Sequence, residues 1–430
     1  MTFKAESREA ERRPDTLRQL TPELSLEYLS AEARGAAMSW LADVSSGVEP
    51  LCDLAGSGAV SRFEKEFAAF VGAEFAVAAP SATLSLLALL QAIGVGPGDE
   101  VIASTYGWGS TVMPILTVGA VPVFADIDAD TLGLDPLDIS RRITPRTRAI
   151  LATHMCGIPC DVVELDRIAE RAGIPLLFDA AQALGAAPTG RPIGNCGLAS
   201  VFSFGHQKLL SLGDGGMLTT NDYRLFAELL RITQHPIRTL PQAIELGFPD
   251  AFDEVSLSSR MHGVAAAMGC ALLPAIPDRI AQRREACDYL SERLSALPGI
   301  RVCGTQRAGR PAFHTVAMTL VPHELGDVHR DGVLELLRSL GIQISAGPVR
   351  VPLHQRHRFR EPSSIAGSTH SPSRACPVAE SRCAESEIVL ESDSRWTRTP
   401  KARVQEIGDA FEYAVSQLIS RRQNHASRAI

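Results

Sequence analysis

The chain has 430 residues, of which 45% are hydrophobic and 21% are charged, and its formal net charge is −7. This length suits two or three domains with large buried cores, and the composition excludes an intrinsically disordered chain. No apolar run reaches the ~20 residues of a transmembrane helix, and the N-terminus, MTFKAESREAERRPD, lacks the apolar segment of a secretory signal. The arginines are scattered rather than gathered in a basic patch. We therefore expect a cytoplasmic protein with no membrane or nucleic-acid partner.

Lysine and cysteine limit the chemistry that the chain can perform. Lysine occurs only at positions 4, 65, 208 and 401, so a reaction that needs an amine nucleophile has four candidates. Nine cysteines are spread along the chain, and no two of them form a CxxC pair. Cys156 and Cys160 follow His154 closely, which is compatible with a metal ion. We favour buried, reduced thiols and expect no metal site.

Short apolar runs alternate with amphipathic segments up to about residue 219, which predicts strands alternating with helices. One helix covers RFEKEFAAFVG and ends at Gly72, and another begins at Asp161. The predicted strands are 74–79, 100–104, 121–127, 148–153, 175–178, 199–204 and 216–219, and the predicted helices are 61–72, 83–93 and 161–172. Such strands form a parallel or mixed sheet covered on both faces, which binds its ligands at the carboxyl ends of the strands.

The pattern changes after about residue 265. A long helix is predicted over 264–297, with Pro274 and Pro277 kinking it. After it we predict a strand at 315–320, a helix at 331–340 and a strand at 341–345. This succession indicates a smaller α+β domain packed on the first.

Two segments are predicted to lie outside the regular structure. Residues 357–400, rich in serine, proline and arginine, are expected to form a long surface loop before a closing helix at 404–419. Residues 1–35 are expected to be a frayed arm or a short surface helix. The predicted organisation is an N-terminal arm with helices (1–57), a large ligand-binding domain (58–265) and a small C-terminal domain (266–430).

Lys208 is the first catalytic candidate. The stretch SFGHQKLLSLGDGG places it after an apolar strand and before a glycine-rich turn. Burial at such a strand end lowers the pKa of a lysine and makes its amine nucleophilic. An exposed loop lysine is the alternative, but Lys4 and Lys401 lie in the tails and Lys65 lies on a helix face. We therefore favour a functional Lys208.

Asp179 ends a second buried run, LLFD, and Gln182 follows it. An aspartate in this place can cap a helix, bind a metal, or keep a pyridine nitrogen protonated, as a pyridoxal cofactor requires. Gln182 is placed to hydrogen-bond an oxygen on the ring of such a cofactor. Asp179 alone does not decide among these roles.

Two further turns follow predicted strands. In APSATL, small residues lead into a helix, whose first N–H groups and the Thr83 hydroxyl can bind a phosphate. An ordinary serine or threonine N-cap has the same pattern. In STYGWG, Trp108 can stack on a flat cofactor or fill the core.

Together, and in this order, these segments resemble those of the DegT/DnrJ/EryC1/StrS aminotransferases, fold-type I enzymes that depend on pyridoxal 5'-phosphate (PLP). The resemblance extends from about Gly58 to Gln417 and includes GVGPGDEVIAST, GAVPVFADID, ITPRTRAILATH, FDAAQALGA, SFGHQK, GDGG and PVAE. It implies an α/β large domain with a mixed, mostly parallel sheet of seven strands and a smaller α+β domain. It also implies a homodimer with the cofactor near the subunit interface.

The resemblance assigns roles to individual residues. It implies that Lys208 forms the Schiff base with PLP, that Asp179 pairs with the pyridinium nitrogen, and that Trp108 stacks on the ring. Gln182 would hydrogen-bond the 3-hydroxyl of the ring. The residues implied to bind the phosphate are Ala82, Thr83 and Ser203, with Ser258 at the position whose side chain reaches the neighbouring subunit's phosphate.

Several positions depart from the family pattern. Ala82 replaces a usual glycine, Gly107 a frequent threonine and Leu184 a common histidine. Ser258 stands where the family commonly has the asparagine of Asn-x-Arg, which alters the contact to the neighbouring phosphate. Because the core motifs are kept while the periphery changes, we expect an unusual substrate or reaction.

The segment PVRVPLH carries the candidate substrate contacts, Arg350 and His354. Arg350 stands where the family usually has an aromatic residue. Near the C-terminus, ESDSRW at 391–396 replaces the family's Ser-Leu-Pro segment. These differences lie in the part of the chain that the resemblance places toward the substrate.

The leading hypothesis is a PLP-dependent aminotransferase that works in a ping-pong cycle. Glutamate or glutamine would donate the amino group, and Lys208 would move the proton between the substrate Cα and the cofactor C4′. The acceptor would be a keto sugar nucleotide or a keto cyclitol, in a natural-product pathway such as antibiotic biosynthesis or in a surface-sugar pathway. The lysine separates this chain from the family's sugar dehydratases, which have histidine there.

Two alternatives stay open. Arg350 could clamp a carboxylate, which would suit racemisation, elimination or carbon–carbon bond formation on an amino-acid-like substrate. A non-catalytic regulator with this fold would be expected to have lost the lysine or the phosphate site. Lys208, Asp179 and Thr83 are all present.

Overall fold

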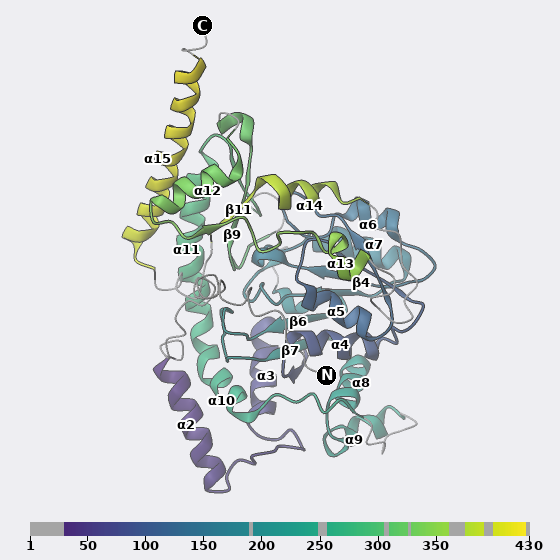
Figure 1. Ribbon diagram of the computed structural model, residues 1–430. Coiled ribbons are helices and arrows are strands. Elements are labelled where there is room, and N and C mark those ends of the chain that lie inside the picture. Colours follow the sequence, from purple (N-terminus) through teal and green to yellow (C-terminus); the bar gives the residue numbers. More distant parts are fainter. Residues whose placement is uncertain are drawn as a thin grey trace, which may run out of the picture.

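The computed structural model describes residues 30–188, 192–247, 256–304, 309–325, 328–360, 375–390 and 399–426. Its centre is a seven-stranded sheet in the order β1-β7-β6-β5-β4-β2-β3 (Figure 1). The strands are β1 (Phe75–Ala79), β2 (Glu100–Ser104), β3 (Val121–Ala125), β4 (Thr147–Thr153), β5 (Leu176–Asp179), β6 (Ala199–Ser203) and β7 (Gly216–Thr220). Only β7 runs antiparallel to its neighbours in this sheet. The seven predicted strands and the mixed, mostly parallel sheet are confirmed.

Helices cover both faces of this sheet. On one face, Val101 and Leu151 pack against α4 (Ala82–Ala92), α5 (Gly109–Thr117) and α8 (Tyr223–Thr233). On the other face, Ile102 and Ile150 pack against α6 (Pro136–Arg142) and α7 (Val162–Ala172). Successive side chains of a strand point to opposite faces, so a sheet covered twice needs strands that are apolar along their whole length.

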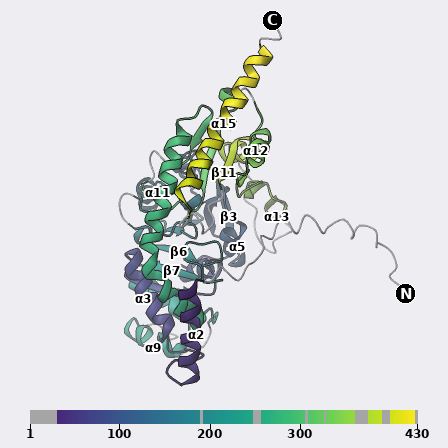
Figure 2. The same ribbon diagram turned by 90° about the vertical axis from the view of Figure 1, so that its left-hand side faces the viewer.

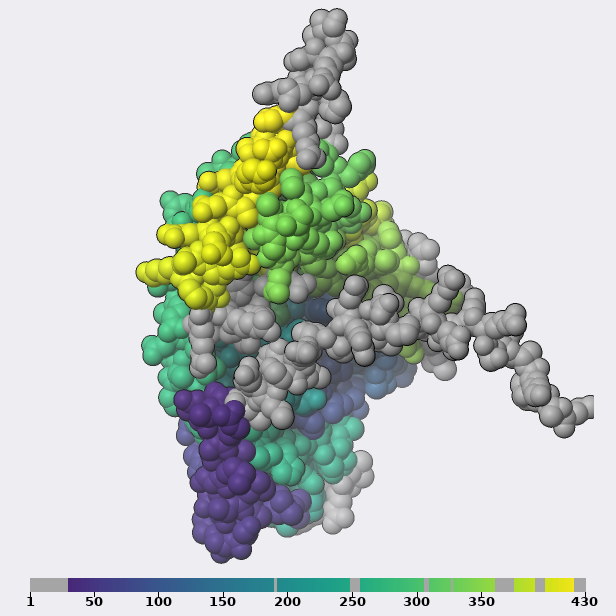
Figure 3. Space-filling model, turned by 60° about the vertical axis from the view of Figure 1, so that its left-hand side comes forward, coloured from purple at the N-terminus to yellow at the C-terminus, as the bar shows by residue number. Residues whose placement is uncertain are grey.

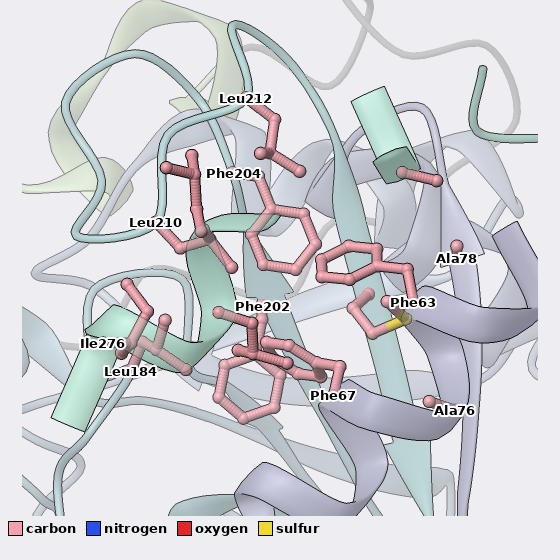
Figure 4. Close-up of a cluster of buried hydrophobic side chains, with 14 of the residues drawn as sticks. Phe63, Phe67, Ala76, Ala78, Leu184, Phe202, Phe204, Leu210, Leu212 and Ile276 are labelled. Atoms are coloured by element: carbon pink, nitrogen blue, oxygen red, sulfur yellow. The ribbon is translucent and has the colours of Figure 1, made fainter. Parts of the chain in front are cut away.

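A cluster of phenylalanines closes the β1–β7 edge of the sheet (Figure 4). Phe63 and Phe67 of α3 (Ala59–Val71) pack on Phe202 and Phe204, with ring centres 5.1–5.4 Å apart. As predicted, α3 ends at Gly72, which adopts φ 71°. Two more helices complete this cluster, α2 (Ala31–Ser45) and α10 (Gly263–Leu272).

Helix α2 begins inside the predicted N-terminal arm and continues to Ser45. Trp40 of α2 is 3% exposed and packs edge-on against His262, directly before α10. Residues 31–35 therefore belong to a packed helix, and the rest of the predicted arm, residues 1–29, lies outside the described residues.

The predicted long helix is divided where its prolines lie. After α10 comes a 3-10 turn that contains Pro274, and α11 (Ile276–Ser295) has Pro277 in its first turn. The joined run is long and apolar enough to cross a membrane by length and composition. Ala266, Leu273 and Ile276 of this run are buried in the first core, as the residues of a core helix would be.

A second, four-stranded sheet follows in the order β10-β11-β9-β8. Its hydrophobic core extends from Cys287 in α11 to Leu418 in α15. The elements are β8 (Ile300–Val302), β9 (Val316–Leu320), α12 (Arg330–Ser339), β10 (Ile344–Ser345), β11 (Glu387–Leu390) and α15 (Lys401–Ala426). Figures 2 and 3 show α15 and this domain at one end of the molecule and α2 at the other. The domain limits at 57/58 and 265/266 stay a prediction.

The prediction of a long surface loop over 357–400 is wrong for its described parts. Strand β11 lies in the middle of the second sheet, and all four of its residues are buried. Before it come α13 (His357–Arg360), α14 (Pro377–Ser381) and a π-helical turn (Arg382–Ser386). The four-residue run EIVL is too short to stand out among polar neighbours. Residues 361–374 and 391–398 lie outside the described residues.

Besides α13 and α14, four helices before residue 250 are absent from the predicted elements: α5, α6, α8 and α9 (Pro236–Glu245). Two of them contain an internal proline, Pro114 in α5 and Pro241 in α9. An internal proline disfavours the prediction of a helix from the sequence. Helix α6 has only seven residues. Helix α8 has a clear amphipathic pattern and begins after Asp222, whose side chain accepts from the Leu225 amide, so the pattern could have revealed it.

Candidate active site

The predicted site residues follow the carboxyl ends of neighbouring strands. Ser104 ends β2, Asp179 ends β5 and Ser203 ends β6. Because β2, β4, β5 and β6 are parallel, their carboxyl ends meet at one edge of the sheet. That edge is the candidate active site.

Asp179 is held in one orientation by two hydrogen bonds. Its carboxylate accepts from the Thr111 hydroxyl at 2.6 Å and from the Ala181 amide at 3.0 Å. The side chain is buried, with 6% of the residue exposed. Neither metal coordination nor helix capping is needed to explain this geometry, because α5 and the turn after β5 already orient the carboxylate.

Lys208 lies in the turn after β6, where its amide donates to the Gly205 carbonyl at 2.9 Å. Burial lowers the pKa of its amine, and the nearby charge of Asp179 opposes this shift. The two residues therefore interact electrostatically although 29 positions separate them in the chain. A lysine with a lowered pKa carries more of the neutral, nucleophilic amine near neutral pH.

His314, which the sequence analysis does not identify, lies near Lys208 in the structure. Its pKa lies well below the ordinary value because the ring is buried and because Lys208 and Arg283 lie nearby. A Cβ added at Gly157 would lie 2.8 Å from both the His314 amide nitrogen and the Gln182 carbonyl oxygen, so these backbones meet at one glycine. In sequence, the single histidine of AFHTV, directly before β9, carries no signal that distinguishes it from a core histidine.

The first turn of α4 carries Ala82 and Thr83, both half-buried. The Ser81 side chain caps this helix by accepting from the Leu84 amide at 3.3 Å. A Cβ added at Gly216 would lie 2.5 Å from the Ala82 amide nitrogen, so glycine is needed there for close packing. A helix N-terminus of this kind attracts an anion such as phosphate.

Ser203 is brought to the same place through β7. It pairs with Gly216 in register, and Gly216 touches the start of α4. The Ser203 hydroxyl is half-buried and accepts from the Gly205 amide at 3.4 Å. Ala82, Thr83 and Ser203 therefore lie around one helix N-terminus, as the phosphate prediction requires.

Gln182 and Trp108 lie on turns at this edge of the sheet. The Gln182 side-chain oxygen accepts from the Cys156 amide at 2.7 Å, so a bond to a ligand would come from its NH₂ group. Trp108 is the N-cap residue of α5 and is 50% exposed, which is more than is usual for a tryptophan that fills a protein core. The core-filling alternative for Trp108 does not agree with this exposure.

Ser258 and Arg350 are exposed, and the described contacts do not connect them with Lys208 or Asp179. Ser258 adopts φ 48°, a left-handed conformation that serine rarely takes. Asparagine, the residue common in the family at this place, tolerates it better. The structure therefore shows a conformational reason for the asparagine besides any contact that it makes.

His354 is placed differently from the expectation of a substrate contact. It is 4% exposed, its Nδ1 bonds the Thr105 hydroxyl, and its Nε2 lies 3.0 Å from Glu380. Both ring nitrogens already have protein partners. Its observed contacts are structural, between the loop after β2 and α14.

The residues considered for a metal site are strongly buried. Burial raises the pKa of Cys156 and of Cys160 to about 12, and it lowers the pKa of His154 to about 3. A cysteine binds a metal as its thiolate, and burial opposes formation of the thiolate at Cys156 and Cys160. The described residues contain no group of three or more histidine, cysteine or acidic side chains with metal-binding geometry.

Comparison with known proteins supports the resemblance. Residues 54–407 match the model of the DegT/DnrJ/EryC1/StrS aminotransferase family. The chain is 35% identical to the spore coat polysaccharide biosynthesis protein SpsC of Bacillus subtilis over 70% of this chain and 78% of that protein. It is 30% identical to the GDP-perosamine synthase of Vibrio cholerae over 69% of this chain and 77% of that protein.

A solved structure agrees with these sequence relatives. The structure of DesV from S. venezuelae, in complex with a ketimine intermediate, is 29% identical and has a TM-score of 0.73, covering 90% of this chain and 95% of that one. The donor set at the sheet edge, an amine beside a carboxylate with a helix N-terminus nearby, fits PLP. The chain therefore belongs to the DegT/DnrJ/EryC1/StrS aminotransferase family and is a PLP-dependent aminotransferase of fold type I.

Proposed function

We propose that this enzyme transfers an amino group from glutamate or glutamine to the keto carbon of a sugar nucleotide or of a cyclitol. The family match and the GDP-perosamine synthases among the relatives support amino transfer to a keto sugar. DesI, a related structure at 30% identity, was solved in the presence of its TDP-sugar product. A pathway that makes a surface polysaccharide or an antibiotic would use such a product.

One observation carries the proposal: Lys208, with its lowered pKa, lies close enough to the fixed carboxylate of Asp179 for the two charges to interact. When bound, PLP supplies an electron sink for the carbanion that forms at the substrate Cα. Lys208 would hold the cofactor through Nζ, and Asp179 would face its pyridine nitrogen. Asp179 is suited to this role because Thr111 and Ala181 bond its oxygens and prevent it from turning away.

The other predicted residues would surround the rest of the cofactor. The exposed indole of Trp108 would stack on the ring, and the NH₂ group of Gln182 would donate to the 3-hydroxyl. The phosphate would bind at the N-terminus of α4, to Ala82, Thr83 and Ser203. Favourable placement of a phosphate at this helix end needs no lysine or arginine.

Lys208 would also move the proton in the reaction. The neutral Nζ would accept the proton from the Cα of the amino donor and would later give it up again, so the same atom would be general base and general acid. Its lowered pKa keeps part of the amine unprotonated near neutral pH, which both roles require. Asp179 opposes this shift and thereby limits how far the pKa falls.

A cytoplasmic homodimer is part of the proposal. Trp108 and Leu84 are exposed at or near the proposed cofactor site, Ser258 is exposed elsewhere on the surface, and a second copy of the chain would cover all three. Ser258 of the second copy would then reach the phosphate.

Reduction of the PLP-loaded protein with borohydride tests the proposal. We expect mass spectrometry of the digest to find the pyridoxyl group on Lys208 and not on Lys65, which is exposed on α3. Adding L-glutamate before reduction should prevent the labelling and release 2-oxoglutarate. Labelling at another lysine, or none, would contradict the role of Lys208. Formation of the amino product from GDP- or TDP-linked keto sugars, compared with a keto cyclitol, then identifies the acceptor class.

A further inference from the structure

Buried polar side chains of the second domain hold the loop that carries Trp108. This loop, Ser104–Trp108, connects β2 with α5. Thr105 and Tyr106 are fully buried, whereas Trp108, two positions further on, is half exposed. The groups that hold Thr105 and Tyr106 therefore anchor the loop two to three positions before Trp108.

Tyr106 is held at both its hydroxyl and its ring. The hydroxyl donates to the Glu387 carboxylate, and the Arg382 Nε donates to the same carboxylate oxygen at 3.3 Å. The Arg382 guanidinium also lies 5.9 Å from the centre of the Tyr106 ring. One arginine thus contacts both the aromatic ring and the carboxylate that binds its hydroxyl.

The second sheet anchors both charges. Arg382 donates through Nη1 to the Thr319 hydroxyl at 2.6 Å and through Nη2 to the Met318 carbonyl at 3.4 Å, and both partners lie in β9. Glu387 is the first residue of β11 and pairs with Thr319 in register. The tyrosine is therefore tied to the two central strands of the second sheet.

This pair is an unfavourable way to fill a core. Glu387 and Arg382 are 0% and 3% exposed, and among the described residues the second carboxylate oxygen of Glu387 has no hydrogen-bond partner. Space for that oxygen exists because residue 347 is glycine with φ 85°, and a Cβ there would overlap the carboxylate. Well-packed apolar side chains of similar volume often stabilise a core as well as a buried ion pair does. Stability alone therefore does not explain the pair.

A second polar connection holds the preceding residue. The Thr105 hydroxyl bonds His354, His354 bonds Glu380, and the Leu353 amide donates to the Thr105 carbonyl at 2.8 Å. Glu380 accepts in addition from the Cys376 amide at 2.9 Å. Since Thr105 has its own connection, loss of the Tyr106 hydroxyl bond would loosen the loop from Tyr106 onward rather than release all of it.

We propose that Arg382 and Glu387 are positioning residues, which act through the Tyr106 hydroxyl to hold the Ser104–Trp108 loop so that the Trp108 indole stacks on the cofactor ring. The inference rests on the proposed function, because it takes its importance from the proposed role of Trp108. The contacts of Tyr106 with Arg382 and Glu387 exist in the protein without cofactor, and their effect on the loop can be measured there.

The first test is Tyr106→Phe, which removes the hydroxyl and keeps the buried ring. We expect hydrogen exchange of the 106–109 amides in the cofactor-free protein to become about tenfold faster, and the Kd for PLP to rise by about the same factor. Exchange in β9 should stay unchanged. Leu337→Ala, a cavity in the same domain with no contact to the loop, is the control for general loss of stability.

The second test separates positioning from stability. The triple variant Tyr106→Phe, Arg382→Met and Glu387→Leu replaces the whole network with apolar side chains and leaves no unpaired charge. We expect its Tm to lie close to that of the wild type, while the hydrogen-exchange rate of the loop and the Kd for PLP stay above the wild-type values. A triple variant that folds poorly leaves the decision to Tyr106→Phe.

The proposal is overturned if Tyr106→Phe leaves both loop exchange and the Kd at the wild-type values, or if the triple variant restores both. Borohydride labelling of Lys208 reports on the proposed function independently. If Lys208 is labelled in the wild type but Tyr106→Phe leaves loop exchange unchanged, only the positioning role of Arg382 and Glu387 is refuted. If Tyr106→Phe loosens the loop but Lys208 is not labelled in the wild type, only the assigned role of Lys208 is refuted.

Discussion

Two polar clusters lie at the carboxyl edge of the central sheet, and they differ in their access to solvent. In the open cluster, Lys208, Ser203 and the first turn of α4 are half-buried around Asp179. In the sealed cluster no member is more than 4% exposed; it consists of Thr105, Tyr106, His354, Arg382 and Glu387. The open cluster brings its groups together from one sheet, whereas the sealed cluster joins two domains.

The difference separates chemistry from geometry. A half-buried lysine can exchange protons and reach a ligand, and partial burial is enough to lower its pKa. A fully buried charge can do neither without a large cost, so it serves by holding its partners in place. Polar residues at one edge of a sheet should therefore be assigned by access as well as by type.

Lys208→Ala, which removes the amine of the open cluster, should have the largest effect on turnover. Because the variant lacks both the amine that holds PLP and the atom that moves the proton, turnover should fall about a thousandfold or more. The folded structure should persist, since the side chain is half-buried and lies in a turn. Transaminase rate and Tm, measured on the same preparation, check the two parts of the prediction.

Lys65→Ala is the matched control, an exposed lysine on α3 that should leave the rate unchanged. A Lys208→Ala enzyme that retains the wild-type rate would remove the basis of the mechanism. A Tm lowered by more than a few degrees would mean that the residue is structural.

The open cluster could be predicted from the sequence because each member follows an apolar run. Lys208, Asp179 and Thr83 are recognised by the strand or turn before them, and parallel topology brings such positions to one edge. The strands themselves were predictable for the same reason, since burial on both faces leaves continuous apolar runs. His314 cannot be recognised in this way, because no such apolar run precedes it.

The sealed cluster could not be predicted. Tyr106 and Glu387 are 281 positions apart, and only the packing of the second sheet brings them together. Glu387 and Arg382 lie in a segment whose composition indicates a surface loop, and a buried ion pair has no local signature. The sequence predicts His354 as a substrate contact because a histidine near a predicted site has the same sequence signal whether it is exposed or buried.

The pH dependence of stability should show the same cost of burying a charge at His154, a sealed residue outside both clusters. This histidine is 0% exposed, stacks on Phe178, and burial lowers its pKa from about 6.5 to about 3. The unfolded chain binds the proton that the folded chain refuses, so this contribution is complete above pH 6.5 and is lost as the pH falls toward 3. Between pH 6.5 and 5 the free energy of unfolding should decrease by about 2 kcal/mol.

His154→Asn checks this assignment, because the amide oxygen can still accept from the Cys160 amide as Nδ1 does. Denaturant unfolding from pH 7 to 5 should show a smaller acid slope in this variant than in the wild type. Equal slopes would mean that His154 is not the residue that resists protonation.

Ser258→Asn, at the position predicted to reach the neighbouring subunit's phosphate, should have the smallest effect of these substitutions. At φ 48° asparagine is less strained than serine, so the variant should be more stable by about 0.5 kcal/mol. If a second copy uses this position to reach the phosphate, the Kd for PLP should also fall severalfold, because an amide reaches further than a hydroxyl. Ser258→Gly separates the two causes, since glycine relieves the strain without adding a donor. Equal PLP affinity in the asparagine and glycine variants would leave only the strain, and the serine would then mark a lost subunit contact.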